Sequence, residues 1–123
     1  MRIDELQIGD WVFDINNDIE CQVDIKDFRN GGEYILDYYE PIPLTAEILE
    51  KNGFKLISEE DKMYRLNLTE DESVAITADF KADEPYVHAR NNCYNVSPRC
   101  FHVHQLQNAL KAIGIYVDVI KKI

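Results

Sequence analysis

The segment EPIPLTAEILEKNGF, residues 40–54, constrains the fold more than any other part of the chain. Its two prolines keep the approach extended, because proline fixes its own φ and disfavours the helical region for the residue before it. Thr45 then suits the N-cap position, where its hydroxyl can accept a hydrogen bond from the first turn. Gly53 suits the left-handed C′ position of a Schellman motif, in which the next residue packs back on the helix. The segment therefore predicts a short helix over residues 46–52.

The sequence before this helix has the pattern of a small β-structure. We expect a first strand to start at Trp11 and a second strand over residues 19–25, where apolar and polar side chains alternate. Asn30-Gly31-Gly32 is a hairpin signal, because these residues tolerate positive φ. Residues 33–39, EYILDYY, are then the return strand. Residues 1–40 therefore predict an antiparallel β-meander or a small open barrel.

The sequence after the helix predicts a second antiparallel sheet. Residues 54–57 suit a short strand, and residues 63–68 and 74–80 alternate in the manner of a hairpin with one apolar face. A third strand is expected over residues 86–90. Residues 91–98 are expected to form a loop.

A second helix is expected near the end of the chain. It ends at Gly114, another C′ glycine, and it starts either near Ser97 or at His104. We favour a strand up to Val103, a helix from His104 and a final extended segment over residues 116–120. The apolar stripe of this helix is Val103, Leu106, Leu110 and Ile113. We expect the apolar residues of the first helix to join the N-terminal meander to the second sheet: Leu44, Ile48, Leu49 and Phe54.

These segments predict an α+β fold, with an N-terminal antiparallel β-meander or small open barrel followed by an antiparallel sheet packed by two short helices. At 123 residues the chain suits a single compact domain, 1–123, with subregions 1–40 and 41–123. No apolar run approaches the ~20 residues that span a bilayer, and the N-terminus lacks an apolar signal region. The three cysteines are odd in number, which argues against a disulfide framework. We therefore expect a cytoplasmic protein without a membrane anchor.

The net charge of −10 limits the classes of partner. Between residues 59 and 84 there are nine acidic residues and three basic ones. Binding to a nucleic-acid backbone needs clustered cations, so direct nucleic-acid binding is not expected. A soluble acidic surface is the simpler interpretation. The alternative is that the acids form one face that mimics nucleic acid and inhibits a DNA- or RNA-binding protein.

The helix segment and VHQLQNALKAIGI, residues 103–115, together resemble a family of small uncharacterised proteins of gut Bacteroidetes and their phages or prophages. The start of the chain, RIDELQIGDWVF, is also similar to the start of that family. The resemblance implies a bacterial or phage cytoplasmic protein of one domain. The family has no established function, so the resemblance supplies no activity, cofactor or site residue.

Polar residues of the second motif form the first candidate site. His104, Gln107 and Asn108 are expected on the first turns of the last helix, where Asn108 shares a face with His104. They either form a polar recognition patch or satisfy buried backbone groups at the start of the helix, and we favour the second interpretation.

A zinc site is a weaker hypothesis, built on Cys93, Cys100, His102 and His104. Their spacing matches no compact cysteine-pair zinc pattern, so we assign no metal and no cofactor. The sequence has no Gly-x-Ser-x-Gly elbow, no glycine-rich phosphate loop and no two-histidine metalloprotease helix. We therefore do not expect an enzyme, and a small metal-binding protein or enzyme remains a third alternative.

The N-terminal region is rich in aromatic residues: Trp11, Phe13, Tyr34, Tyr38 and Tyr39. These either build a core or line a groove for a partner, because Tyr and Trp are enriched at interaction hot spots. We favour the core, with a partner groove as the next option. The function expected from the sequence is a non-enzymatic accessory or interaction protein that binds another macromolecule, with an unknown protein as partner. The candidate interaction surface comprises Trp11, Tyr38, Tyr39, His104, Gln107 and Asn108.

Overall fold

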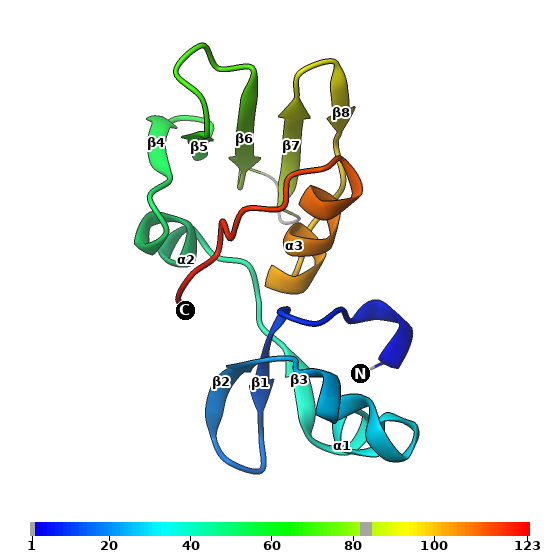
Figure 1. The fold of residues 1–123 in the computed structure, drawn as a ribbon. Coiled ribbons are helices and arrows are strands. Elements are labelled where there is room, and N and C mark those ends of the chain that lie inside the picture. Colours follow the sequence, from blue (N-terminus) through cyan, green and yellow to red (C-terminus); the bar gives the residue numbers. More distant parts are fainter. Residues whose placement is uncertain (1, 82–84) are drawn as a thin grey trace.

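The computed structural model describes residues 2–81 and 85–123. The regular structure of these residues consists of two antiparallel sheets, three α-helices and two 3-10 segments, and Figure 1 shows the smaller sheet below the larger one. The smaller sheet has the strand order β2-β1-β3, and the larger has the order β4-β5-β6-β7-β8. The predicted α+β fold, with a small antiparallel sheet followed by a larger one packed by short helices, is confirmed.

The smaller sheet is built around β1. Strand β1 (Trp11–Asp14) pairs antiparallel with both β2 (Ile19–Gln22) and β3 (Tyr39–Pro41). Strand β3 therefore lies on the opposite side of β1 from β2. A short 3-10 segment, η1 (Ile3–Glu5), precedes this sheet. The core of this part consists of Leu6, Val12, Val23, Ile35 and Tyr39.

The predicted hairpin at Asn30-Gly31-Gly32 and the predicted return strand over residues 33–39 are wrong. The chain instead forms η2 (Ile25–Gly32) and then the helix α1 (Glu33–Tyr38). All three turn residues have positive φ, at 53°, 71° and 73°. A two-residue hairpin turn of type I′ needs only two residues with positive φ. Here three successive residues have positive φ, and the chain continues as a helix and does not pair back as a strand. Tertiary packing of the tyrosines here overrides their strand propensity.

The larger sheet follows the predicted strands closely. It contains β4 (Lys55–Ser58), β5 (Met63–Asn67), β6 (Val74–Asp79), β7 (Tyr86–Asn91) and β8 (Tyr94–Val96), each antiparallel to its neighbours. The predicted loop over residues 91–98 is wrong, because it contains β8. Asn92, with a φ of 56°, helps to close the tight turn between β7 and β8, a conformation that asparagine tolerates better than most residues.

Helix α2 (Ala46–Lys51) has the predicted caps at both ends. Its N-cap hydroxyl, Thr45 Oγ1, accepts a hydrogen bond from the Ile48 amide at 3.3 Å. At its C-terminal end the Phe54 amide donates to the Leu49 carbonyl at 3.0 Å, which is the long bond of a Schellman motif. The predicted helix and its exit are therefore confirmed.

Helix α3 (Val103–Ala112) begins one residue before the predicted start at His104 and not near Ser97. Two isolated bridges, Tyr86 with Arg99 and Pro43 with His102, occur where a strand up to Val103 was predicted. The start is marked by Gln105, whose Oε1 accepts the amides of Phe101 and His102, each at 2.9 Å. This arrangement is a capping box, and it was not expected from the sequence because histidine is not a usual N-cap residue.

Helices α2 and α3 cover the same face of the larger sheet (Figure 1). The larger core includes the four packing residues predicted for the first helix: Leu44, Ile48, Leu49 and Phe54. Trp11 and Phe13 of the smaller sheet also pack against this core, so they connect the two parts. The segment 116–120 pairs with no strand, and its residues Val119 and Ile120 are buried. Among the described residues, no helix has the length and apolar character that crossing a membrane requires.

Candidate functional site

The α3 seam is a row of polar contacts between α3 and the N-terminal segment. Gln107 Oε1 accepts the Trp11 amide at 2.8 Å, and Gln107 Nε2 donates to the Gly9 carbonyl at 3.2 Å. Asn108 Nδ2 donates to the Glu5 carbonyl at 2.9 Å. Gln107 and Asn108 therefore satisfy backbone groups, as the favoured interpretation predicted. Those groups belong to the first eleven residues, however, and not to the start of the helix.

His104 lies inside this seam and is 2% exposed. Among the described residues neither ring nitrogen has a hydrogen-bond partner, and the ring stacks nearly parallel to His102 with centroids 5.8 Å apart. Burial lowers the pKa of His104, His102 acts in the same direction, and Glu5 opposes them. A buried, neutral histidine cannot form a surface patch. The prediction that His104 belongs to an interaction surface is therefore wrong.

Asp10 is a buried charged residue beside α3 that the sequence did not single out. It is completely buried, and its Oδ2 accepts the Gln7 amide at 2.9 Å. Lys111 Nζ lies 3.7 Å from the other carboxylate oxygen. Burial raises the pKa of Asp10, although the Gln7 amide and the Lys111 ammonium both oppose this shift. The pattern Gly-Asp before the first strand was visible in the sequence, but nothing local indicated that α3 would cover it.

The hypothetical zinc ligands do not come together. Cys93 is exposed, Cys100 is buried, and His102 is half-buried beside the buried His104. In residues 2–81 and 85–123 no group of three or more His, Cys, Asp or Glu side chains is placed to hold a metal ion. The described structure therefore does not assemble these four residues into one cluster. Burial raises the pKa of the Cys100 thiol to about 11, so it behaves as a core residue.

The described acidic residues lie at both ends of strand β5 and do not form a single cluster. Residues 59–61 lie in the turn before β5, and residues 70–72 lie in the turn after it. Strand β5 separates these turns by roughly 17 Å, since each strand residue advances about 3.3 Å. Asp79 pairs with Met63 at the first of these ends. Asp83 and Glu84 lie outside the described residues. This arrangement counts against a single nucleic-acid-like surface.

The tyrosine groove is a hollow of about 440 Å³ between η2 and α1. Its lining consists of Lys26, Asp27, Arg29, Asn30, Glu33, Tyr34, Asp37 and Tyr38. The rings of Tyr34 and Tyr38, one helical turn apart, have centroids 4.7 Å apart. The Tyr34 hydroxyl donates to Asp14 Oδ2 at 2.9 Å, which holds this aromatic wall in place.

The buried Asp14 supports the wall of the tyrosine groove through its hydrogen bond with Tyr34. Burial alone would raise its pKa, but hydrogen bonds from the Asn17 side chain and the Tyr34 hydroxyl lower it. Asp14 therefore remains an ionised acceptor for Tyr34 at neutral pH. This support has no signature in the sequence, because Asp14 is in β1 and Tyr34 is in α1.

The other predicted aromatic surface residues serve the interior. Trp11 is half-buried, and its Nε1 donates to the Ile120 carbonyl at 2.9 Å. Tyr39 is buried in the smaller core, so its prediction as a surface residue is wrong. Tyr38 is exposed and lines the tyrosine groove. Of the six residues predicted as an interaction surface, Tyr38 alone lines this groove.

Comparison of the chain with models of protein families, with curated proteins and with solved structures gives no match. The function must therefore be inferred from the geometry of this molecule. The titratable groups of the seam face the interior, whereas the tyrosine groove opens to solvent. The groove is the better candidate for a functional site.

Proposed function

We propose that this protein is a non-enzymatic interaction protein that binds a partner protein through the tyrosine groove. The observation that supports the proposal is the pair of groove tyrosines, Tyr34 and Tyr38, one of which is held in place by Asp14. Tyrosine supplies a large contact area, and its enrichment at hot spots makes such a pair a suitable anchor. A wall that is ordered before binding lowers the entropic cost of association.

The charges around the groove favour a polypeptide over a polyanion. Lys26 and Arg29 come from η2, whereas Asp27, Glu33 and Asp37 contribute negative charge beside them. A nucleic-acid backbone would meet more acids than bases here, which is unfavourable. A polypeptide can pair its own donors, acceptors and mixed charges with both signs. The resemblance to proteins of gut Bacteroidetes and their phages supports a search for the partner in a bacterial cytoplasm.

The test is site-specific crosslinking in bacterial cells. The full chain carries p-benzoylphenylalanine in place of Glu33, a residue of the groove lining, and crosslinked products are identified by mass spectrometry. We expect one protein to dominate the products, and the substitution Tyr38→Ala should reduce its yield about tenfold, as expected for a hot-spot tyrosine. Tyr86→Ala is the matched control, because Tyr86 is a similarly exposed tyrosine on β7 of the larger sheet.

Two results would contradict this proposal. One is a set of crosslinked products that is unchanged by Tyr38→Ala. The other is loss of the crosslink in Tyr38→Ala and Tyr86→Ala alike, which would show that the effect is not specific to the groove. Circular dichroism of each variant establishes that the chain is still folded.

The acidic inhibitor is a weaker candidate, because its acids lie at two ends of β5. Two results together would favour the acidic inhibitor over binding through the tyrosine groove. The dominant crosslinked partner would be a nucleic-acid-binding protein, and the crosslink would be abolished by charge reversal at residues 70–72 but not by Tyr38→Ala.

A further inference from the structure

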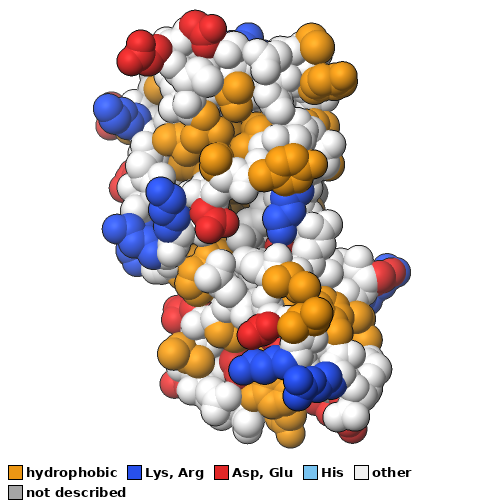
Figure 2. Space-filling model, viewed as in Figure 1, with side chains coloured by type: hydrophobic (Ala, Val, Ile, Leu, Met, Phe, Trp, Pro, Cys, Tyr) orange, Lys and Arg blue, Asp and Glu red, His pale blue; other side chains and the backbone are white. Residues whose placement is uncertain are grey.

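A second groove, the lysine groove, lies between β5 and the C-terminal segment 114–122. It consists of an apolar hollow of about 210 Å³ and a second hollow of about 350 Å³, and Leu68 lines both. The apolar hollow is lined by Leu68, Thr69, Val74, Asn91, Gly114, Ile115, Tyr116 and Val117. Figure 2 shows hydrophobic side chains gathered on the upper half of this face, with Lys and Arg side chains along one edge.

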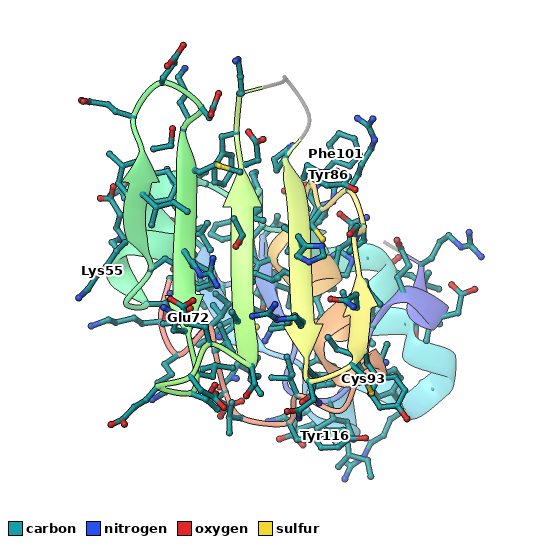
Figure 3. The ribbon with its side chains drawn as sticks, turned by 90° about the horizontal axis from the view of Figure 1, so that it is seen from above. Lys55, Glu72, Tyr86, Cys93, Phe101 and Tyr116 are labelled. Atoms are coloured by element: carbon teal, nitrogen blue, oxygen red, sulfur yellow. The ribbon has the colours of Figure 1, made fainter. Side chains whose placement is uncertain are left out.

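The apolar end of the groove is open to solvent. Tyr116 is 79% exposed and Val117 is 62% exposed, although both lie beside the half-buried Leu68 and Val74. Figure 3 shows Tyr116 extending from the end of the molecule where the C-terminal segment passes the sheet. Covering these exposed side chains with a partner would remove apolar surface from water, which favours binding.

The other end of the groove is basic. Lys51, Lys121 and Lys122 line the second hollow, together with Leu66, Val119 and the single acid Asp118. Lys51 already contacts Glu47 at 3.8 Å. Within residues 2–81 and 85–123, no carboxylate lies in ion-pair distance of Lys121 or Lys122. A chain of net charge −10 therefore carries a local cluster of cations next to an apolar hollow.

The groove is held in shape by hydrogen bonds of Asn52. Its Oδ1 accepts the amides of Lys121 and Lys122 at 2.7 and 3.2 Å, and its Nδ2 donates to the Lys122 carbonyl at 2.8 Å. The Trp11 indole also donates to the Ile120 carbonyl. The wall that carries the two lysines is therefore fixed before any partner binds, which favours affinity.

We propose that the lysine groove binds an extended acidic segment of a partner protein, with one large apolar residue in the apolar hollow and carboxylates beside Lys121 and Lys122. Charge complementarity selects an anionic occupant, and the apolar hollow selects one that carries an apolar side chain. A nucleic acid could contact the lysines, but it carries no apolar side chain that would fill the apolar hollow. The site is separate from the tyrosine groove, so the protein would connect two polypeptides.

The test measures the anisotropy of a fluorescein-labelled peptide, Leu-Phe-Gly-Glu-Asp-Glu-Glu, and of its reversed sequence, mixed with the full chain. We expect one of the two peptides to bind saturably. Its binding should weaken as sodium chloride is added, since salt screens exposed charges. Tyr116→Ala should weaken binding about tenfold, as for a hot-spot aromatic residue. The double variant Lys121→Glu, Lys122→Glu should also weaken it about tenfold, because charge reversal replaces attraction with repulsion.

Two matched controls keep the test specific. Tyr86→Ala and Lys55→Glu should each leave the affinity within about twofold of the unmodified chain, since changes outside an interface have little effect on binding. Figure 3 shows Tyr86 at the end of the sheet opposite to Tyr116, and Lys55 at the β4 edge. Neither residue lines the hollows of the lysine groove. Tyr116, Lys121 and Lys122 are exposed, so their variants should fold, and circular dichroism checks this.

Several results would overturn the proposal. These are absence of binding in both peptide orientations, equal binding of a peptide with lysines in place of the acids, or equal weakening by the control variants. Binding of oleate or of a single-stranded oligonucleotide through Lys121 and Lys122, without peptide binding, would assign the groove to another ligand class. Self-association that Tyr116→Ala abolishes would assign it to a second copy of the chain. None of these results depends on Tyr38, so failure here leaves the tyrosine-groove proposal standing, and the reverse also holds.

Discussion

The substitution Gln107→Met tests whether the α3 seam holds the two parts of the molecule together. Methionine has a volume and flexibility close to those of glutamine, so packing is largely retained. The thioether cannot replace the amide, so the bonds to the Trp11 amide and the Gly9 carbonyl are both lost. The change therefore isolates hydrogen bonding from packing.

The expected loss of stability follows from these two bonds. Each is worth about 0.5–1.5 kcal/mol net, and a buried amide left without a partner adds a desolvation cost of about 1–3 kcal/mol. The Trp11 amide is only partly buried, and the Gly9 carbonyl keeps a bond from Gln22 Nε2 at 3.1 Å. We therefore expect the free energy of unfolding to fall by about 2–3 kcal/mol. With an unfolding entropy of about 2.1 cal/mol/K per residue, Tm should fall by roughly 10 °C.

The assay is urea unfolding followed by tryptophan fluorescence and by circular dichroism. Trp11 is the only tryptophan and lies where the smaller sheet meets the larger core, so its emission reports on the seam. Circular dichroism reports on the whole backbone. In the unmodified chain the fluorescence and dichroism transitions should coincide. In Gln107→Met both transitions should move to lower urea concentration, and the fluorescence transition should move at least as far as the dichroism transition.

The matched control is Gln22→Met. Gln22 donates to the same Gly9 carbonyl, but its side chain is exposed, so its loss should cost less than about 0.5 kcal/mol because water replaces the bond. A change within about 0.5 kcal/mol for Gln107→Met, or equal effects of the two substitutions, would refute the conclusion that the seam is a strong link between the two parts.

Three further predictions concern single residues. The folded-state pKa of His104 lies below its ordinary value of 6.5, so the unfolded chain binds more protons just below that pH. The urea midpoint should therefore fall as the pH falls from neutral through 6.5, and His104→Leu should weaken this dependence; an unchanged pH profile would contradict the buried neutral state. Gly53 has a φ of 89°, so Gly53→Ala should cost about 1–2 kcal/mol in urea unfolding and Gly53→Asn less, since asparagine tolerates the left-handed region. Equal costs would argue against backbone strain. With a thiol reagent at neutral pH, Cys93 should react in the folded protein, whereas the buried Cys100, with its pKa raised to about 11, should react only after unfolding. Peptide mapping separates the two, and early modification of Cys100 would contradict its burial.

The candidate sites depend on contacts that the sequence pattern did not contain. The tyrosine groove exists because residues 33–38 form a helix, in which Tyr34 and Tyr38 are neighbours on one face with ring centroids 4.7 Å apart. In the predicted strand they would also share a face but would lie about 13 Å apart, since each strand residue advances about 3.3 Å. The lysine groove exists because Asn52 positions the C-terminal segment beside β5. The lysine groove thus depends on residues that are far apart in the chain. The tyrosine groove depends on a choice between helix and strand that local propensity alone did not decide.

The sequence by itself determined helix α2 with both its caps, the glycine that ends α3, four of the five strands of the larger sheet and the α+β class. A cap, a Schellman glycine and an alternating strand involve residues within a few positions of each other, so the pattern carries their physics directly. Only the tertiary structure decided that residues 33–38 are helical, that His104 and Asp10 are buried in a seam, and that two grooves remain open. These outcomes depend on which surfaces meet across the fold, because burial and long-range hydrogen bonding outweigh local propensities of about 1 kcal/mol or less.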